Sequence, residues 1–96
     1  MAQPKLQPRF PLGRLVATPG ALAAMTEAGQ NPIELLQRHQ GGDWGEVCPD
    51  DAAENELSVA EGYRVMSVHA LPSGVRVWLI TEADRSTTVI LLPDEY

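Results

Sequence analysis

Two histidines, His39 and His69, are the side chains of this sequence best suited to acid–base chemistry. His39 is close in sequence to Asp43, and a neighbouring carboxylate can hold the tautomer of a histidine that acts as a general base. If both imidazoles shared a cleft, they could serve as the base and acid of a metal-independent ribonuclease. Each also has an ordinary explanation. A histidine at a helix end often contacts the last carbonyls, and a histidine in a strand is often half-buried.

The densest polar cluster of the chain, Glu82 to Thr88, contains Arg85. Its guanidinium could clamp a phosphate or a carboxylate, and in a ribonuclease it would stabilise the charge that develops on the phosphorane. The same residues also suit a hairpin turn in which the acids and Arg85 pair locally.

Two tryptophans, Trp44 and Trp78, are candidates for a protein-binding surface, because tryptophan is enriched at interaction hot spots. We expect both to take part in such a surface together with Arg85. Trp44 also suits the core, since the chain has only five aromatic residues with which to fill one.

Metal, cofactor and thiol chemistry are not expected. Asp50, Asp51 and Glu54 supply carboxylates but lack the glycine-punctuated loop of calcium sites. Cys48 has no second thiol to pair with, and the proline and acids that follow it do not activate a nucleophile. A single cysteine favours a reducing, cytoplasmic location. No apolar run approaches the roughly 20 residues that a membrane-spanning helix needs, and the N-terminus lacks the apolar stretch of a signal peptide.

Charge is distributed unevenly along the chain, whose net charge is −6. Residues 41–62 carry seven acids and no base, whereas residues 1–40 have a net charge of +2 and residues 63–96 a net charge of −1. Direct nucleic-acid binding is disfavoured, because it needs clustered Lys and Arg. The acidic block at 43–61 could imitate phosphates and inhibit a nucleic-acid-binding protein, or it could be a solvated helix face.

The 96 residues suffice for one domain. Residues 1–9, with two prolines among polar residues, are expected to form a flexible arm, and residues 10–96 a single α+β domain. Thr18-Pro19 predicts one helix, which Gly29 ends, and Asn31-Pro32 predicts a second that runs to about Gln40. A third helix is expected from a cap at Asp50 or Asp51 to Gly62.

Three β-rich segments, at 63–71, 75–81 and 87–92, predict an antiparallel meander, and residues 10–17 could add an edge strand. Three short helices would then pack on a small antiparallel sheet. In the segment 75–81, one face carries Val77 and Leu79 while the other carries Trp78 and Ile80. The second face should need a cover such as the N-terminal arm or a second subunit.

Three stretches, FPLGRLVATPGALAAM, HQGGDWGEV and WLITEADRSTTVILLPDEY, resemble a group of small uncharacterised bacterial proteins. Proteins of this group are carried on plasmids, integrative elements and integron gene cassettes. The resemblance spans residues 10–96 and implies the cargo of a mobile element. It implies no activity, because the function of the group is unknown.

Together these patterns favour a non-catalytic domain that associates with itself or with a protein partner through Trp44, Trp78 and Arg85. One alternative is a ribonuclease-like toxin that uses His39, His69 and Arg85. The other is an acidic inhibitor of a host nucleic-acid-binding protein. No small-molecule ligand, cofactor or membrane partner is implied.

Overall fold

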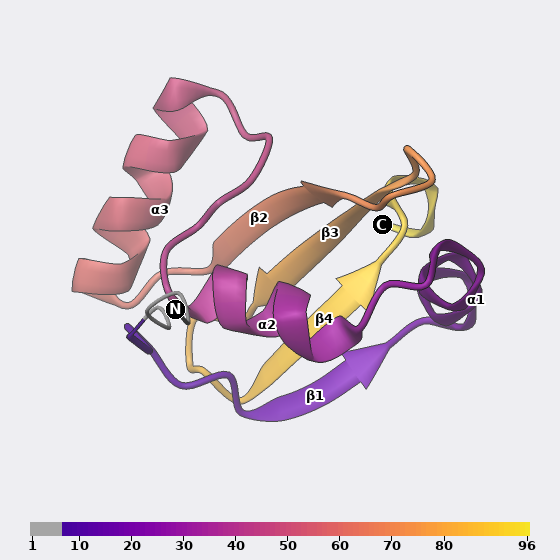
Figure 1. The fold of residues 1–96 in the computed structure, drawn as a ribbon. Helices are drawn as coiled ribbons and strands as arrows, with labels where there is room; N and C mark the ends of the chain where they lie inside the picture. The colour runs from indigo at the N-terminus through magenta and orange to yellow at the C-terminus, as the bar shows by residue number, and fades with distance from the viewer. Residues whose placement is uncertain (1–6) are drawn as a thin grey trace, which may run out of the picture.

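The computed structural model describes residues 7–96 and confirms the predicted α+β class, with three α-helices and a four-stranded sheet (Figure 1). The elements follow the chain as β1 (Arg14–Ala17), α1 (Pro19–Ala28), α2 (Pro32–Gln40), α3 (Pro49–Glu61), β2 (Val65–Ala70), β3 (Arg76–Thr81), β4 (Thr87–Leu91) and the short 3-10 turn η1 (Pro93–Glu95). Among residues 7–96, no helix is both long and apolar enough to cross a bilayer.

Local capping signals fix the first two helices where the sequence predicts them. The side chain of Thr18 accepts a hydrogen bond from the Ala21 N–H, and Asn31 accepts one from the Ile33 N–H. Helix α3 begins earlier than expected, at Pro49, and the residue before it makes no side-chain cap. Asp50 and Asp51 are therefore not caps. They lie in the first turn, where the helix dipole favours carboxylates.

The three C-terminal strands form the predicted antiparallel meander, and β1 joins it as an edge strand in the order β1-β4-β3-β2. The prediction of a wholly antiparallel sheet is wrong, because β1 runs parallel to β4. A parallel neighbour requires a long crossover, and the helices with β2 and β3 supply it. The strand itself is shorter than 10–17, since the chain before Arg14 includes Pro11 and a glycine at φ +66°.

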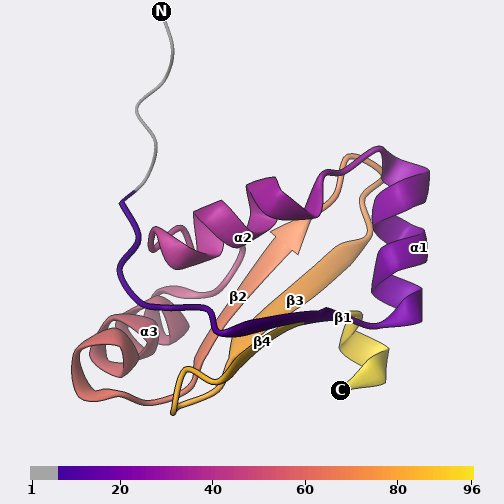
Figure 2. The same cartoon turned by 90° about the horizontal axis from the view of Figure 1, so that it is seen from below.

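One face of the sheet meets α1 and α2 and holds the main core, which includes Met25, Leu35, Val77, Leu79 and Ile90. The opposite face is covered in part by the chain's own C-terminus, since η1 contacts β3 and lies across the sheet from α2 (Figure 2). The Tyr96 ring packs against Trp78 with centroids 5.4 Å apart, and Ile80 is only 2% exposed. Ile80 therefore needs no cover from a second subunit.

Of the predicted arm, residues 1–9, the first six residues lie outside the described part of the chain. Arg9 belongs with the folded domain. Its N–H donates to the Gln40 carbonyl, and its guanidinium makes two hydrogen bonds to Glu56, at 2.9 and 2.7 Å.

Candidate functional site

Buried polar side chains on the helix-facing side of the sheet form a continuous hydrogen-bond chain around His39. Its Nδ1 lies 2.6 Å from Ser67 Oγ, and its Nε2 lies 2.9 Å from Thr81 Oγ1. Thr81 Oγ1 is 2.7 Å from Thr88 Oγ1, which donates to the Leu12 carbonyl. His39, Ser67, Thr81 and Thr88 are all fully buried.

The direction of this chain fixes the tautomer of His39. Leu12 offers a carbonyl that can only accept, so the Thr88 hydroxyl donates there and must accept from Thr81. The single proton of Thr81 is then in use, and His39 Nε2 has to donate to Thr81 Oγ1. His39 Nδ1 is left as the acceptor for Ser67. A neutral imidazole satisfies every member of the chain.

Burial of the ring, together with the nearby positive charges of His69 and Arg85, lowers the pKa of His39 to about 3. The expected partner of this imidazole, Asp43, lies elsewhere: its carboxylate pairs with Arg38 at 2.7 Å and accepts from the Gly45 N–H. The prediction that Asp43 orients His39 is therefore wrong, as is the expectation that this side chain contacts the last helical carbonyls.

His69 is 1% exposed, and among the described residues neither of its ring nitrogens has a hydrogen-bond partner. Burial lowers its pKa to about 4. The loop after α2 closes over it. A Cβ built on Gly45 would lie 2.8 Å from His69 Nδ1. Above His39, the rings of Phe10 and Trp44 pack at centroid distances of 5.4 and 6.1 Å.

This arrangement does not provide the acid–base pair of a nuclease. Both histidines stay neutral over the physiological pH range, and neither is open to a substrate in this conformation. The sequence does not point to Ser67 or Thr81, and it suggests Thr88 only as an auxiliary donor beside Arg85, a role it does not have here because its hydroxyl bonds to Thr81 and Leu12. The signal for a buried polar chain is that each of the three occupies an inward position in a strand where the alternation calls for an apolar residue. Within residues 7–96, no group of three or more His, Cys, Asp or Glu could hold a metal ion.

Arg85 lies in the β3–β4 turn and holds the end of α3 instead of an open anion site. Its guanidinium donates to the carbonyls of Tyr63, Ser58 and Glu82 at 2.6, 2.9 and 3.2 Å. It also lies over the ring of Phe10 at 5.4 Å from the centroid. The backbone of Arg85 has φ +60°, the only positive φ of a non-glycine among residues 7–96. The guanidinium therefore joins the turn to the helix.

Replacing Arg85 with asparagine should lower the free energy of unfolding by about 1–3 kcal/mol, because charge-assisted bonds to three carbonyls are lost. Asparagine tolerates the positive φ of this position, so the change isolates the guanidinium. Urea denaturation measures the loss. The matched control is Arg64→Asn, which removes an exposed guanidinium that lies over the Tyr96 ring. Equal stability of the Arg85 variant and the wild type would instead leave this arginine available to bind an anion.

The two predicted interface tryptophans lie in different environments. Trp44 is 6% exposed, stacks on Phe10 at 6.3 Å and donates its indole N–H to Glu56. Trp78 is half-buried on the face that η1 partly covers. With Arg85 bound to the end of α3, these three residues do not form one surface.

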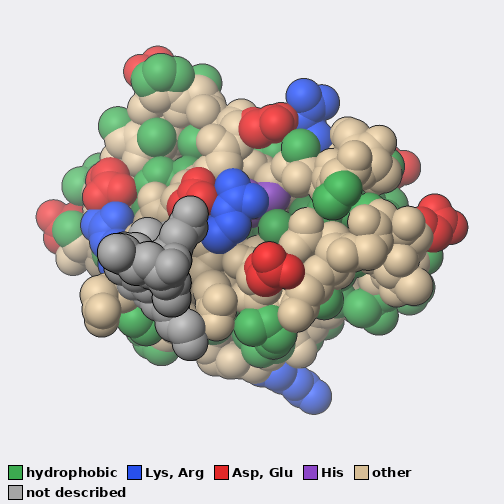
Figure 3. Space-filling view, viewed as in Figure 1, with side chains coloured by type: hydrophobic (Ala, Val, Ile, Leu, Met, Phe, Trp, Pro, Cys, Tyr) green, Lys and Arg blue, Asp and Glu red, His purple; other side chains and the backbone are tan. Residues whose placement is uncertain are grey.

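The acidic block does not present a continuous negative surface. Three of its acids pair with arginines: Glu56 with Arg9, Asp43 with Arg38 and Glu46 with Arg76. Hydrogen bonds from Arg9 and from Trp44 lower the pKa of the Glu56 carboxyl to about 2. On the face seen in Figure 3, basic and acidic side chains lie beside one another and are not segregated by sign.

The two edges of the sheet differ sharply, and the edge at β2 is closed. Asn55 of α3 donates to the Met66 carbonyl at 2.6 Å and accepts from the Met66 N–H at 3.1 Å. The loop after α2 continues this cover, since the Val68 N–H donates to Trp44 O and the Glu46 N–H donates to Val68 O. The outward-facing backbone groups of Met66 and Val68 are thus satisfied within the chain.

Among the described residues, nothing covers the edge at β1. The Arg14 N–H donates to the carbonyl of Ser86, just before β4, and the Thr18 N–H donates to the carbonyl of Ile90 in β4. By strand alternation, the backbone groups of Leu15 and Ala17 point away from the sheet. They have no hydrogen-bond partner among residues 7–96. Leu15 is 51% exposed and Val16 is 42% exposed, and an exposed apolar edge of this kind is a template for another strand.

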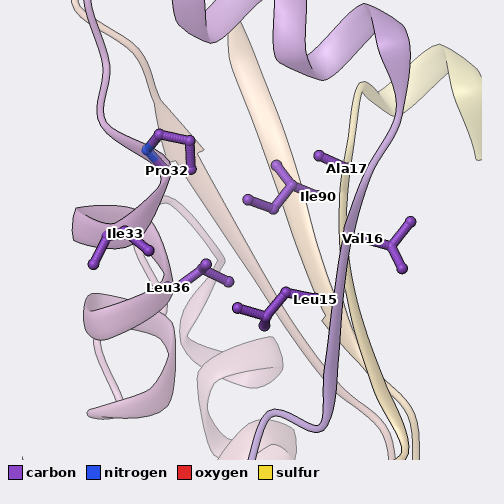
Figure 4. Close-up of a pocket in the computed structure, with 7 residues that line it drawn as sticks. All are labelled: Leu15, Val16, Ala17, Pro32, Ile33, Leu36 and Ile90. Atoms are coloured by element: carbon purple, nitrogen blue, oxygen red, sulfur yellow. The ribbon is translucent and has the colours of Figure 1, made fainter.

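An apolar groove of about 200 Å³ runs beside this edge, between β1 and α2. Figure 4 shows Leu15 and Leu36 pointing into it from the two sides, and Val16 pointing away on the other face of the sheet. The groove is lined by Leu15, Val16, Ala17, Pro32, Ile33, Leu36 and Ile90. Ile33 at its rim is 51% exposed. The open edge and the groove, together called the β1 surface below, form the candidate functional site.

No family model matches the chain, and neither a curated protein nor a solved structure shows significant similarity to it. The resemblance to small proteins of bacterial mobile elements therefore stays a prediction.

Proposed function

We propose that this chain is a non-catalytic protein-binding domain that accepts a β-strand at the β1 surface. The observation that carries the proposal is the contrast between the two sheet edges. Asn55, Trp44 and Glu46 satisfy the backbone of β2, whereas the outward groups of Leu15 and Ala17 on β1 have no partner among residues 7–96. Proteins generally protect exposed strand edges against pairing with other chains. An edge that stays open and apolar is therefore suited to pairing with a specific partner strand.

Strand addition uses two features that this surface combines. The N–H and C=O groups of Leu15 and Ala17 would supply the main-chain hydrogen bonds, which are independent of the partner's sequence. Alternate side chains of the added strand would point toward the groove, where Leu15, Ile33 and Leu36 offer apolar contacts. Selectivity would then come from apolar residues at every second position of the partner.

Replacing Leu15 with glutamate should weaken the binding of strand-forming peptides by about tenfold or more, because a charge would lie in the groove. The probes are peptides selected from a random display library on the full chain, and calorimetric titration gives their affinities. Amide hydrogen exchange should show Leu15 and Ala17 protected in the complex. Ile33→Glu should act in the same direction.

The matched control is Leu57→Glu, which changes a side chain of α3 with a similar exposed fraction, 47%. Peptide affinities that respond equally to the Leu15 and Leu57 variants would contradict the proposal. So would protection that appears on β2 instead of β1.

A cytoplasmic location, and an origin on a bacterial mobile element, remain part of this proposal. The single free cysteine, Cys48, supports the first, and the resemblance of residues 10–96 supports the second. The ribonuclease and acidic-inhibitor hypotheses lack comparable support, because the histidines are buried and three acids of the block are paired.

A further inference from the structure

Resting on the proposed function, we propose that the strand bound at the β1 surface is the β1 strand of a second copy of this chain. The two strands would pair antiparallel about a two-fold axis at Val16 and join two four-stranded sheets into one of eight. The proposal follows from the backbone register, the charges beside the strand and the apolar side chains that this pairing would cover.

The backbone allows one register. Because Leu15 and Ala17 carry the outward groups, an axis at Val16 pairs Leu15 with the partner's Ala17 and Ala17 with the partner's Leu15. Both pairs can exchange two hydrogen bonds, which gives four in all. An axis at Leu15 would require Gly13, whose φ of +66° takes it out of the strand. An axis at Ala17 would pair Leu15 with Pro19, which has no N–H.

The same register brings opposite charges together on the face that carries Val16. Arg14 is exposed and makes no ion pair within residues 7–96. It would lie opposite the partner's Thr18. The Glu95 carboxylate lies at that position, where it accepts hydrogen bonds from the Thr18 hydroxyl at 2.5 Å and from the Leu92 N–H at 2.8 Å. Because the axis is two-fold, the ion pair between Arg14 and the partner's Glu95 would form twice, once on each side of the axis. The surface is therefore complementary in charge to a second copy of itself.

The pairing also covers apolar surface that the single chain exposes. Leu15 is 51% exposed, and it would face the partner's Ala17 beside the groove. Val16, at 42% exposed, would contact the partner's Val16 across the axis. Because Val16 directs its own backbone groups to β4, this central pair is of the non-hydrogen-bonded type, with Cα atoms about 4.5 Å apart.

That separation suits a disulfide, which bridges Cα atoms about 4.4–6.8 Å apart. The test is therefore Val16→Cys in a Cys48→Ser background, oxidised under mild conditions. We expect a covalent dimer to form at least about ten times faster than with Val75→Cys in the same background. Val75 lies outside β1 and has the same exposed fraction, 42%.

Light scattering from low micromolar to millimolar concentration should show a dimer of the wild type. Arg14→Glu should raise its dissociation constant by about tenfold, because each new carboxylate would face the partner's Glu95. Both cysteine variants are checked for folding by circular dichroism. A dimer in which the Val16→Cys and Val75→Cys variants cross-link at equal rates would overturn the proposed interface. A strict monomer would overturn self-pairing, yet peptide binding lost in Leu15→Glu would still support the proposed function.

Discussion

Replacing Gly45 with alanine is expected to lower the free energy of unfolding by about 3–5 kcal/mol. A Cβ at this position would overlap the Val68 carbonyl oxygen and lie 2.8 Å from His69 Nδ1. The backbone there has φ +71°, which an L side chain rarely adopts. Because the Val68 oxygen belongs to a paired strand, the loop has to move instead. The bonds of Trp44 and Glu46 to Val68 would then break.

The matched control is Gly29→Ala at the end of α1. Its φ is +69°, almost the same, but nothing lies within 4 Å of the added Cβ. This variant should lose only about 1 kcal/mol, the ordinary cost of a side chain in the left-handed region. Urea denaturation of both variants gives the comparison. Equal losses would show that the contact with the β2 edge does not stabilise the fold.

Acidification from about pH 7 to about pH 5 is expected to destabilise the fold by about 2 kcal/mol through His39 alone. Its pKa falls from 6.5 in the unfolded chain to about 3 in the folded one, so between these values the unfolded state binds more protons. Stability is therefore lost as the pH drops below about 6.5. His69, with its pKa lowered to about 4, acts in the same direction.

Urea denaturation across this pH range measures the effect. Glu56 does not interfere, because its pKa is lowered from 4.5 to about 2 and the stability it contributes is lost only below about pH 4.5. The decisive variant is His39→Gln, which keeps hydrogen-bonding groups but does not titrate. It should be less stable at neutral pH and should depend less on pH. An unchanged pH dependence in this variant would contradict the assignment to His39.

The buried chain around His39 links this pH dependence to the fold. In the neutral state the Ser67 hydroxyl donates to His39 Nδ1. Protonation of Nδ1 would turn this nitrogen into a donor as well, so that two donors would face each other. The chain cannot reverse, because its other end is the Leu12 carbonyl. It also joins residues 12, 39, 67, 81 and 88, so it holds β2, β3, β4, α2 and the segment before β1 in one arrangement. We therefore assign His39 a structural role.

Elements whose signals are local follow from the amino-acid sequence. A cap such as Thr18 or Asn31 bonds to an N–H two or three residues away, so the positions of α1 and α2 follow from neighbouring residues alone. The alternation and turn residues after Gly62 likewise determined β2, β3 and β4. The start of α3 was misplaced, because the acids that suggested a cap lie within its first turn.

The pairing of β1 and the roles of the polar candidates depend on long-range packing. The polar candidates bond to residues that are distant in the sequence. Arg85 donates to the Ser58 carbonyl, and Asn55 donates to the Met66 carbonyl. His39 bonds to Ser67 and Thr81. A side chain of given chemistry can bind a ligand or satisfy a buried group of its own protein, and its spacing is the same in both cases. Which edge of the sheet stays open is decided by what the rest of the chain covers, and this depends on the packing of all the elements together.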